Sequence, residues 1–253
     1  MVQYEKLWEE IKKRYPMPYG MCIMVNMKFS INRYIVLICP MESILLLIIR
    51  EVKKMSMSFE IFPTIKKKPN CEEIIKYSVE LFSEFLKREN ISQRIDITTK
   101  EVTADNEVYT NPISLALKEN NYTVFNLNGE GEVYVFYHKL TELDKDFWDE
   151  ELQGNTHAQS MKEKVDANLE IGYSWSVKRT MGQPAIVSLY YGYLAIGIAI
   201  LTDGLIYSDD GAWDYSRLPI LGEDFKTEYL SIKNISDTIV KDNVEKCLDE
   251  LKN

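Results

Sequence analysis

The strongest hydrophobic pattern in the chain is an uncharged stretch, Pro184–Leu201, which reads PAIVSLYYGYLAIGIAIL. Small residues recur every three or four positions on one side of the helix that it would form, and bulky residues recur on another side. A helix that is apolar all round is either a core helix or a membrane span, and 18 residues is borderline for crossing about 30 Å of hydrocarbon. Because the chain as a whole is polar, with a mean hydropathy of −0.24, we predict a central helix buried by protein.

Before this stretch, strand-like and helix-like patterns alternate from residue 58 onward. Asn70, with Glu73 three residues later, forms the pattern of a helix start, and the apolar positions that follow repeat with helical spacing up to Leu86. The dipeptide Asn111–Pro112 predicts a second, short helix to about Glu119. The predicted strands are Ser58–Phe62, Arg94–Thr103, Tyr122–Leu127 and Glu132–His138, the last two joined by a hairpin loop at residues 128–131.

The second half of the chain has a mainly helical pattern. One predicted helix covers the acidic segment Leu143–Leu152, and another begins at Thr156 and runs through Val165 towards Trp175. The remaining predicted elements are a short strand, Leu205–Tyr207, and helices near Gly222–Leu230 and Ser236–Lys252. This order predicts an α+β fold: a small mixed sheet with flanking helices, and a helical C-terminal half around one buried apolar helix.

Residues 1–54 have the pattern of an N-terminal extension, and we predict that residues 55–253 form a single α+β domain. Within the extension we expect a helix over Gln3–Tyr15, a strand over Met21–Leu37 and a second helix over Met41–Lys54. Whether the extension belongs to the core, or whether a shorter chain starts at Met55 or Met57, stays open at this point.

Composition and charge narrow the possible classes of function. The formal net charge is −9 and the pI is about 5.0, yet residues 1–68 carry 12 basic and 6 acidic side chains, so the remaining 185 residues carry −15. This balance argues against a nucleic-acid-binding protein with one broad basic face. The four cysteines are far apart and only two histidines are present, so the sequence predicts neither a disulfide framework nor a structural zinc site. Phosphate-binding loops are absent as well, and we expect a cytoplasmic protein that needs no cofactor.

The densest cluster of polar and aromatic residues is Asp203–Tyr215, DGLIYSDDGAWDY. An EF-hand does not fit, because aligning its glycine on Gly211 would place Ile206 and Arg217 at ligand positions. We interpret the segment as a contact surface for a protein partner, with partner-binding residues Asp209, Asp210, Trp213, Asp214 and Arg179. The alternative is structural: the aspartates cap a turn, and Arg179 pairs with Asp209, Asp210 or Asp214. A further functional interpretation is that Arg179 helps the backbone amides at the start of the apolar helix to bind an anion.

Catalytic patterns are weak. No Gly-x-Ser-x-Gly motif is present, and His138, at the end of a predicted strand, is expected to be structural. Two weak catalytic candidates remain, His157 near a predicted helix start and Glu170. A carboxylate- or metal-assisted hydrolase would use these two residues with Asp209 and Asp210.

We therefore expect a non-catalytic, acidic protein-interaction module. Tyrosine and tryptophan side chains supply binding energy, while carboxylates attract a partner that is itself basic. By analogy, a toxin-neutralising protein of the immunity type fits this description. The expected partner is a protein, and neither nucleic acid nor a membrane. The hydrolase is the alternative.

Overall fold

A computed structural model describes residues 57–252, and it describes the backbone of residues 23–29, 32–38 and 47–50. The chain divides into two compact units, Met1–Lys53 and Lys54–Asn253. In the first unit, strands β1 (Ile23–Phe29), β2 (Asn32–Ile38) and β3 (Leu47–Arg50) form an antiparallel sheet in that order.

The structure corrects two predictions for this first unit. The segment Met21–Leu37 is a hairpin of two strands rather than one strand, and the predicted helix Met41–Lys54 contains strand β3. Leu47, Ile48 and Ile49 are apolar neighbours, and a short apolar run of this kind fits a strand as well as a buried helix. The predicted helix Gln3–Tyr15 lies outside the described residues.

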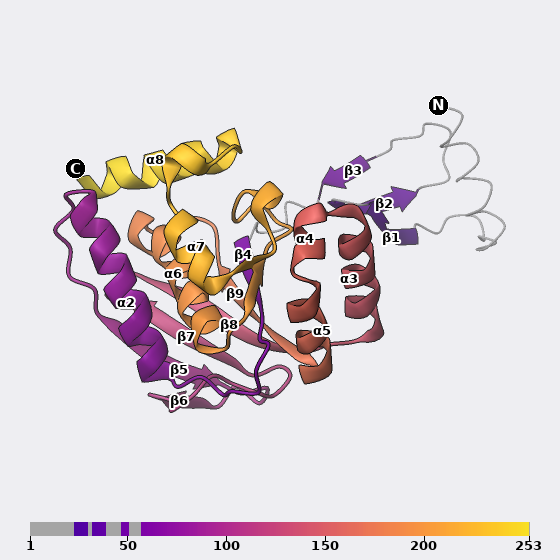
Figure 1. The fold of residues 1–253 in the computed structure, drawn as a ribbon, viewed down its shortest axis with the longest axis horizontal. Helices are drawn as coiled ribbons and strands as arrows, with labels where there is room; N and C mark the ends of the chain where they lie inside the picture. Colours follow the sequence, from indigo (N-terminus) through magenta and orange to yellow (C-terminus); the bar gives the residue numbers. More distant parts are fainter. Residues whose placement is uncertain (1–22, 30–31, 39–46, 51–56, 253) are drawn as a thin grey trace. The chain divides into compact units, whose positions relative to one another are not determined.

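The second unit is built on an eight-stranded antiparallel sheet with the order β11-β10-β4-β9-β8-β7-β5-β6 (Figure 1). The α+β class is confirmed. The sheet, however, is larger than predicted and antiparallel throughout, so the expectation of a small mixed sheet is wrong in both respects. Its strands are β4 (Met57–Phe62), β5 (Ile97–Val102), β6 (Val108–Thr110), β7 (Tyr122–Leu127), β8 (Gly131–Lys139), β9 (Tyr173–Arg179), β10 (Leu205–Tyr207) and β11 (Ile220–Leu221).

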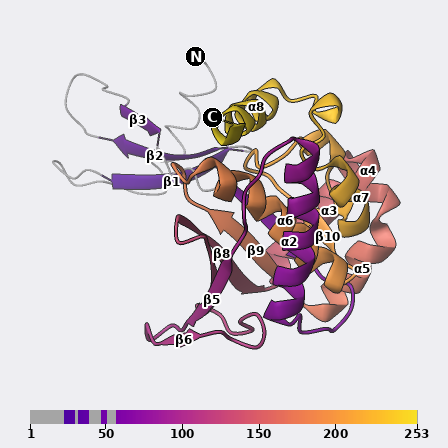
Figure 2. The same ribbon diagram turned by 90° about the vertical axis from the view of Figure 1, so that its left-hand side faces the viewer.

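The helices of this unit lie on both sides of the sheet. Helix α6 packs against β4, β8 and β9, and helices α2, α7 and α8 pack against α6 (Figures 1 and 2). Helix α3 reaches the opposite face, where Trp148 packs on Phe62 of β4 and Phe147 packs on Tyr207 of β10. The helix bounds are α2 (Cys71–Arg88), α3 (Glu142–Gly154), α4 (Thr156–Ser160), α5 (Lys162–Ile171), α6 (Ala185–Leu201), α7 (Gly222–Glu228) and α8 (Thr238–Lys252).

Helix α6 is the core helix that its sequence predicts. Pro184 is its N-cap, and every residue from Ala185 to Ala199 except Ser188 is buried, because the sheet covers one side and three helices cover the others. Within the described residues, none of the helices combines the length and the apolar character needed to cross a bilayer.

Strand β9 is the main departure from the predicted elements, since the helix that begins after Asn155 does not continue to Trp175. It breaks into α4 and α5 and ends at Gly172 in the left-handed conformation, and β9 then enters the middle of the sheet. The strand alternates: Trp175 and Val177 point to the α6 side, while Ser174 and Ser176 point to the opposite side.

The short helix predicted after Asn111–Pro112 is also wrong. Residues 111–120 form a loop, and the backbone N–H of Cys71 binds the Ile113 carbonyl in place of a helical partner.

Candidate functional site

Residues 208–215, which follow β10 and which we call the acidic turn, are held against the sheet by hydrogen bonds to Asp210. Its carboxylate accepts hydrogen bonds from the backbone N–H and the hydroxyl of Ser58, both at 2.7 Å, and from the hydroxyl of Ser208 at 3.1 Å. Burial raises the pKa of Asp210, and these hydrogen bonds oppose that rise. Asp210 therefore connects the turn to the first residues of β4.

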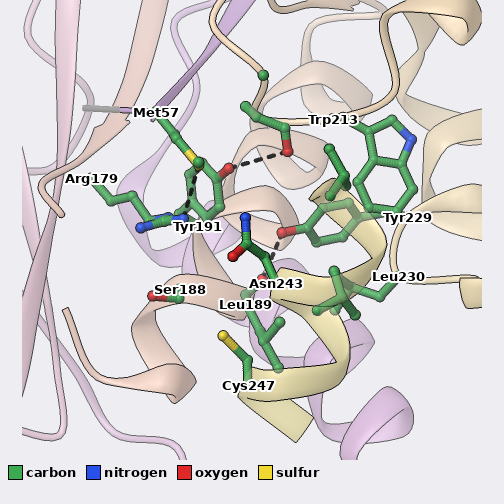
Figure 3. Close-up of a pocket in the computed structure, with 14 residues that line it drawn as sticks. Met57, Arg179, Ser188, Leu189, Tyr191, Trp213, Tyr229, Leu230, Asn243 and Cys247 are labelled. Carbon is green, nitrogen blue, oxygen red and sulfur yellow. Dashed lines mark hydrogen bonds between the residues drawn. The ribbon is translucent and has the colours of Figure 1, made fainter. Parts of the chain in front are cut away.

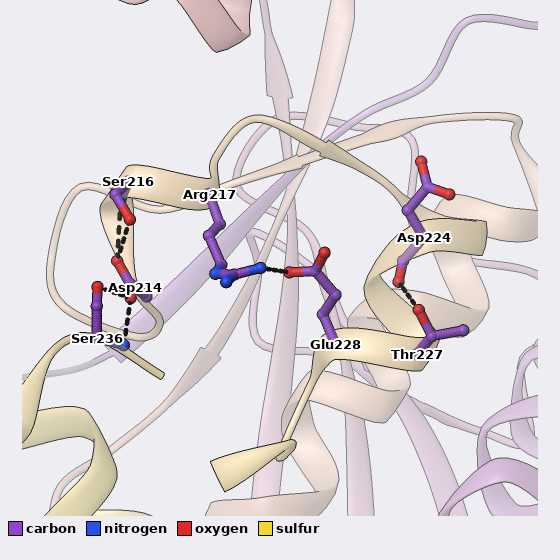
Figure 4. Close-up of polar contacts among 7 residues, drawn as sticks. All are labelled: Asp214, Ser216, Arg217, Asp224, Thr227, Glu228 and Ser236. Atoms are coloured by element: carbon purple, nitrogen blue, oxygen red, sulfur yellow. Dashed lines mark hydrogen bonds and ion pairs between the residues drawn. The ribbon is translucent and has the colours of Figure 1, made fainter. Parts of the chain in front are cut away.

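Asp214 connects the same turn to the chain segment before α8 (Figure 4). It accepts hydrogen bonds from the backbone N–H groups of Ser216 at 3.1 Å and Ser236 at 2.8 Å, and from both serine hydroxyls. Burial alone would raise the pKa of Asp214, but the bonds from Ser236 and Ser216 outweigh it and lower the pKa to about 2. The Asp214 carboxylate is therefore already engaged by hydrogen bonds from its own chain.

Two further members of the predicted contact surface differ in exposure. Trp213 is only 2% exposed, and its ring packs against Phe225 and Tyr229 at centroid distances of 5.7 and 5.0 Å. Asp209 is exposed. The alternative interpretation, in which aspartates cap the turn, matches the bonding of Asp210 and Asp214.

Arg179, the last residue of β9, lies against α6 instead of the aspartates. Its guanidinium carbon stands 4.9 Å from the ring centre of Tyr191, and one of its terminal nitrogens is 3.0 Å from the sulfur of Met57 (Figure 3). Among the described residues, Arg179 forms no ion pair with Asp209, Asp210 or Asp214, so the predicted pairing is wrong.

The guanidinium lines a small pocket of roughly 40 Å³ between β9, α6, α8 and the turn. Its Nε atom is buried and has no hydrogen-bond partner. The side chains of Ser188, Tyr191, Asn243 and Cys247 also line the pocket (Figure 3). Burial raises the pKa of Cys247 and of Tyr191, while the positive charge of Arg179 acts in the opposite direction on both.

The two weak catalytic candidates lie on different helices. His157 is half-buried on α4, where its backbone N–H binds the Asn155 side chain, and its Nε2 atom is buried without a partner. Glu170 is exposed on α5. Within the part of the chain that the structure describes, no three His, Cys, Asp or Glu side chains lie close enough together to hold a metal ion.

Sequence reasoning missed a half-buried carboxyl group in the middle of the sheet. Glu60 of β4 stands opposite Ser176 of β9, whose hydroxyl donates a hydrogen bond of 2.6 Å to it. Burial raises the pKa of Glu60 to about 7, against the opposing influence of Ser176 and Lys178, and the charges of Asp209 and Asp210 raise it further. The glutamate inside the otherwise uncharged segment SFEIF, residues 58–62, is the feature of the sequence that could have indicated this carboxyl group.

The sequence also contains no indication of the hydrogen bonds that join the acidic turn and β10 to α3. Tyr215 donates a hydrogen bond to Glu151 of α3 at 2.8 Å, and the hydroxyl of Tyr207 lies 3.3 Å from the same carboxylate. The outer side of α3 exposes four carboxylates, which with Asp209 form what we call the acidic surface: Glu142, Asp146, Asp149, Glu150 and Asp209.

A second, open pocket of about 330 Å³ lies at the end of strands β7 and β8. Its floor includes the rings of Tyr122 and Phe136, which are 5.0 Å apart, and its rim includes Glu119, His138 and Lys139. Burial and the charge of Lys178 lower the pKa of His138. Charges of both signs surround this pocket, so it has no clear electrostatic preference.

Comparison of the chain with protein-family models, with curated proteins and with solved structures gave no match. The function therefore has to be inferred from the chemistry of these residues alone.

Proposed function

We propose that the chain is a non-catalytic module that binds a basic protein partner through the acidic surface. An immunity-type role, in which the partner is a toxin, is the particular form of this proposal that the overall acidity favours. A partner that carries many lysines and arginines would be attracted over a distance and then held at short range.

The observation that carries the proposal is the hydrogen bond between Tyr215 and Glu151, because it joins the acidic turn to the acidic helix. Two apolar anchors accompany the carboxylates, since Tyr215 is 48% exposed and Leu143 of α3 is 78% exposed. Carboxylates steer association, and exposed aromatic and aliphatic side chains add contact energy. Helix α3 is itself held firmly, because Trp148 is fully buried and Asp144 forms a capping box with Thr141.

The test is a pair of charge reversals that match in number, spacing and exposure. One variant carries Asp146→Lys and Glu150→Lys on α3, and the control carries Glu80→Lys and Glu84→Lys on the exposed side of α2. Each protein is used to capture partners from the cells that produce it, and the captured partner is then purified and its affinity is measured at several salt concentrations.

We expect the α3 variant to lose at least about tenfold in affinity, with the loss shrinking as salt increases, and the α2 variant to bind like the wild type. Melting temperatures show whether both variants are folded. Equal binding by the two folded variants would contradict the proposal.

A further inference from the structure

We propose that the pocket beside Arg179 binds a carboxylate group, which the guanidinium holds. This inference depends on the pocket alone and not on the acidic surface. The carboxylate belongs either to a small free acid or to a polypeptide, and the two sources can be distinguished by experiment.

The charge of the pocket favours an anion. Among the described residues that line the pocket, Arg179 is the only charged one, and the other lining groups are apolar or neutral. The nearby carboxylate of Asp210 already accepts three hydrogen bonds from Ser58 and Ser208. Asp210 is therefore engaged by these donors and not by Arg179, so the guanidinium remains without a paired carboxylate among the described residues and favours an anion.

Arg179 also lacks strong hydrogen-bond acceptors. A guanidinium has five N–H donors in a planar fork that matches a carboxylate. The Nε–H of Arg179 is buried without an acceptor, and the sulfur of Met57, 3.0 Å from a terminal nitrogen, is only a weak one. A carboxylate that binds the terminal nitrogens from the pocket would form the stronger, charge-assisted hydrogen bonds that the guanidinium lacks.

The pocket is also large enough for the group. A volume of roughly 40 Å³ corresponds to about three water-sized atoms. A carboxylate group has three non-hydrogen atoms, so the group fits. The exposed side chain of Asn243 lies at the edge of the pocket and leaves a route from solvent.

The experiment follows the arginine Nε–H signals of the isotope-labelled full chain by NMR. Sodium acetate is titrated at constant ionic strength, with sodium chloride as the balancing salt. An Arg179→Gln variant assigns the Arg179 signal, and Arg217 is the internal control, because it is paired with Glu228 at 2.8 Å and lies outside the pocket.

We expect the Arg179 signal to move to saturation at millimolar acetate, while the Arg217 signal stays in place. Arg179→Gln, followed through backbone signals around Tyr191, should weaken acetate binding by at least about tenfold. If that variant does not fold, Asn243→Asp replaces it: this exposed change adds a negative charge at the pocket edge and should also weaken binding.

A short peptide with a free C-terminal carboxylate is then compared with the same peptide in amidated form. Tighter binding of the free peptide than of acetate identifies a polypeptide as the source, and tighter binding of acetate identifies a small acid. An absent or non-saturating response to acetate, an equal response of Arg217, or binding of both peptides with equal affinity would overturn the proposal. None of these outcomes depends on the charge reversals on α3.

Discussion

At the scale of single residues, the sheet contains an acid whose ionisation opposes folding. Glu60 has a pKa of about 7 in the folded protein and an ordinary value near 4.5 when unfolded. The folded state therefore binds the proton more tightly, and its stability falls as the pH rises from about 4.5 through about 7. The shift corresponds to a loss of at most about 3 kcal/mol across that range.

We predict that Glu60→Gln removes this loss. The amide can still accept the 2.6 Å hydrogen bond from Ser176 but does not ionise. Urea unfolding at pH 5 and pH 8 measures the effect, and the variant should be more stable than the wild type at pH 8 and similar to it at pH 5. Parallel pH dependence in both proteins would show that Glu60 does not ionise in this range.

Asp214 and Asp209 offer a second test within one turn. Asp214→Asn weakens the capping of the Ser216 and Ser236 N–H groups, so we expect a loss of about 1–2 kcal/mol. The neighbouring Asp209 is exposed, and Asp209→Asn should stay within about 0.5 kcal/mol of the wild type. Chemical denaturation of both variants at pH 7 gives the comparison, and similar losses would mean that Asp214 does not act as a cap.

At the scale of elements, the packing of helix α6 depends on the close approach between Gly192 and the ring of Tyr229. A Cβ atom at Gly192 would lie 2.0 Å from the ring of Tyr229, whereas at Gly197 the nearest atom would be 3.4 Å away. Alanine favours a helix over glycine by about 1 kcal/mol. Gly197→Ala should therefore be neutral or stabilising, and Gly192→Ala should lose about 1–3 kcal/mol through overpacking against Tyr229, the residue that follows α7.

Thermal and urea unfolding of the two alanine variants measure the difference. A double variant, Gly192→Ala with Tyr229→Ala, tests the cause, because removing the ring removes the clash. Its loss should be smaller than the sum of the two single losses. Additive losses would show that the Gly192 contact is not responsible.

The elements that could be predicted from sequence are those whose patterns are local. Helix α6 is uncharged throughout, and Asn70 caps α2 by accepting from the N–H of Glu72, so both are visible in the order of residues. Strand β9 was missed because Ser174 and Ser176 are buried polar residues, and their partners come from strands far away in sequence. Tertiary pairing overrides local pattern at that point.

The candidate site shows the same limit. The turn at Asp209–Gly211 was visible in the sequence, but the hydrogen-bond partners of its aspartates were not. Asp210 bonds to a serine 152 positions away, and Tyr215 bonds to a glutamate 64 positions away. Sequence identifies which residues carry charge, whereas the fold decides which charges are already satisfied.

At the scale of the whole molecule, the two units differ in charge as well as in fold. Residues 1–53 carry eight basic and five acidic side chains, which gives a net charge of +3. Because the whole chain has a net charge of −9, the second unit has a net charge of −12. The α+β body in residues 57–252 contains a continuous core that includes Phe59, Trp175 and Leu194.

We predict that residues 54–253, produced alone, fold as they do in the full chain, because the sheet order from β11 to β6 and the helices around α6 lie within that span. Near-ultraviolet circular dichroism and the melting temperature should match those of the full chain to within a few degrees. A chain that begins at Thr64 is the control: it lacks β4, which pairs with both β9 and β10, and it should not fold cooperatively. If the chain from residue 54 lost its near-ultraviolet signal and bound a hydrophobic dye, the first unit would have to be part of the same folding unit as the eight-stranded sheet.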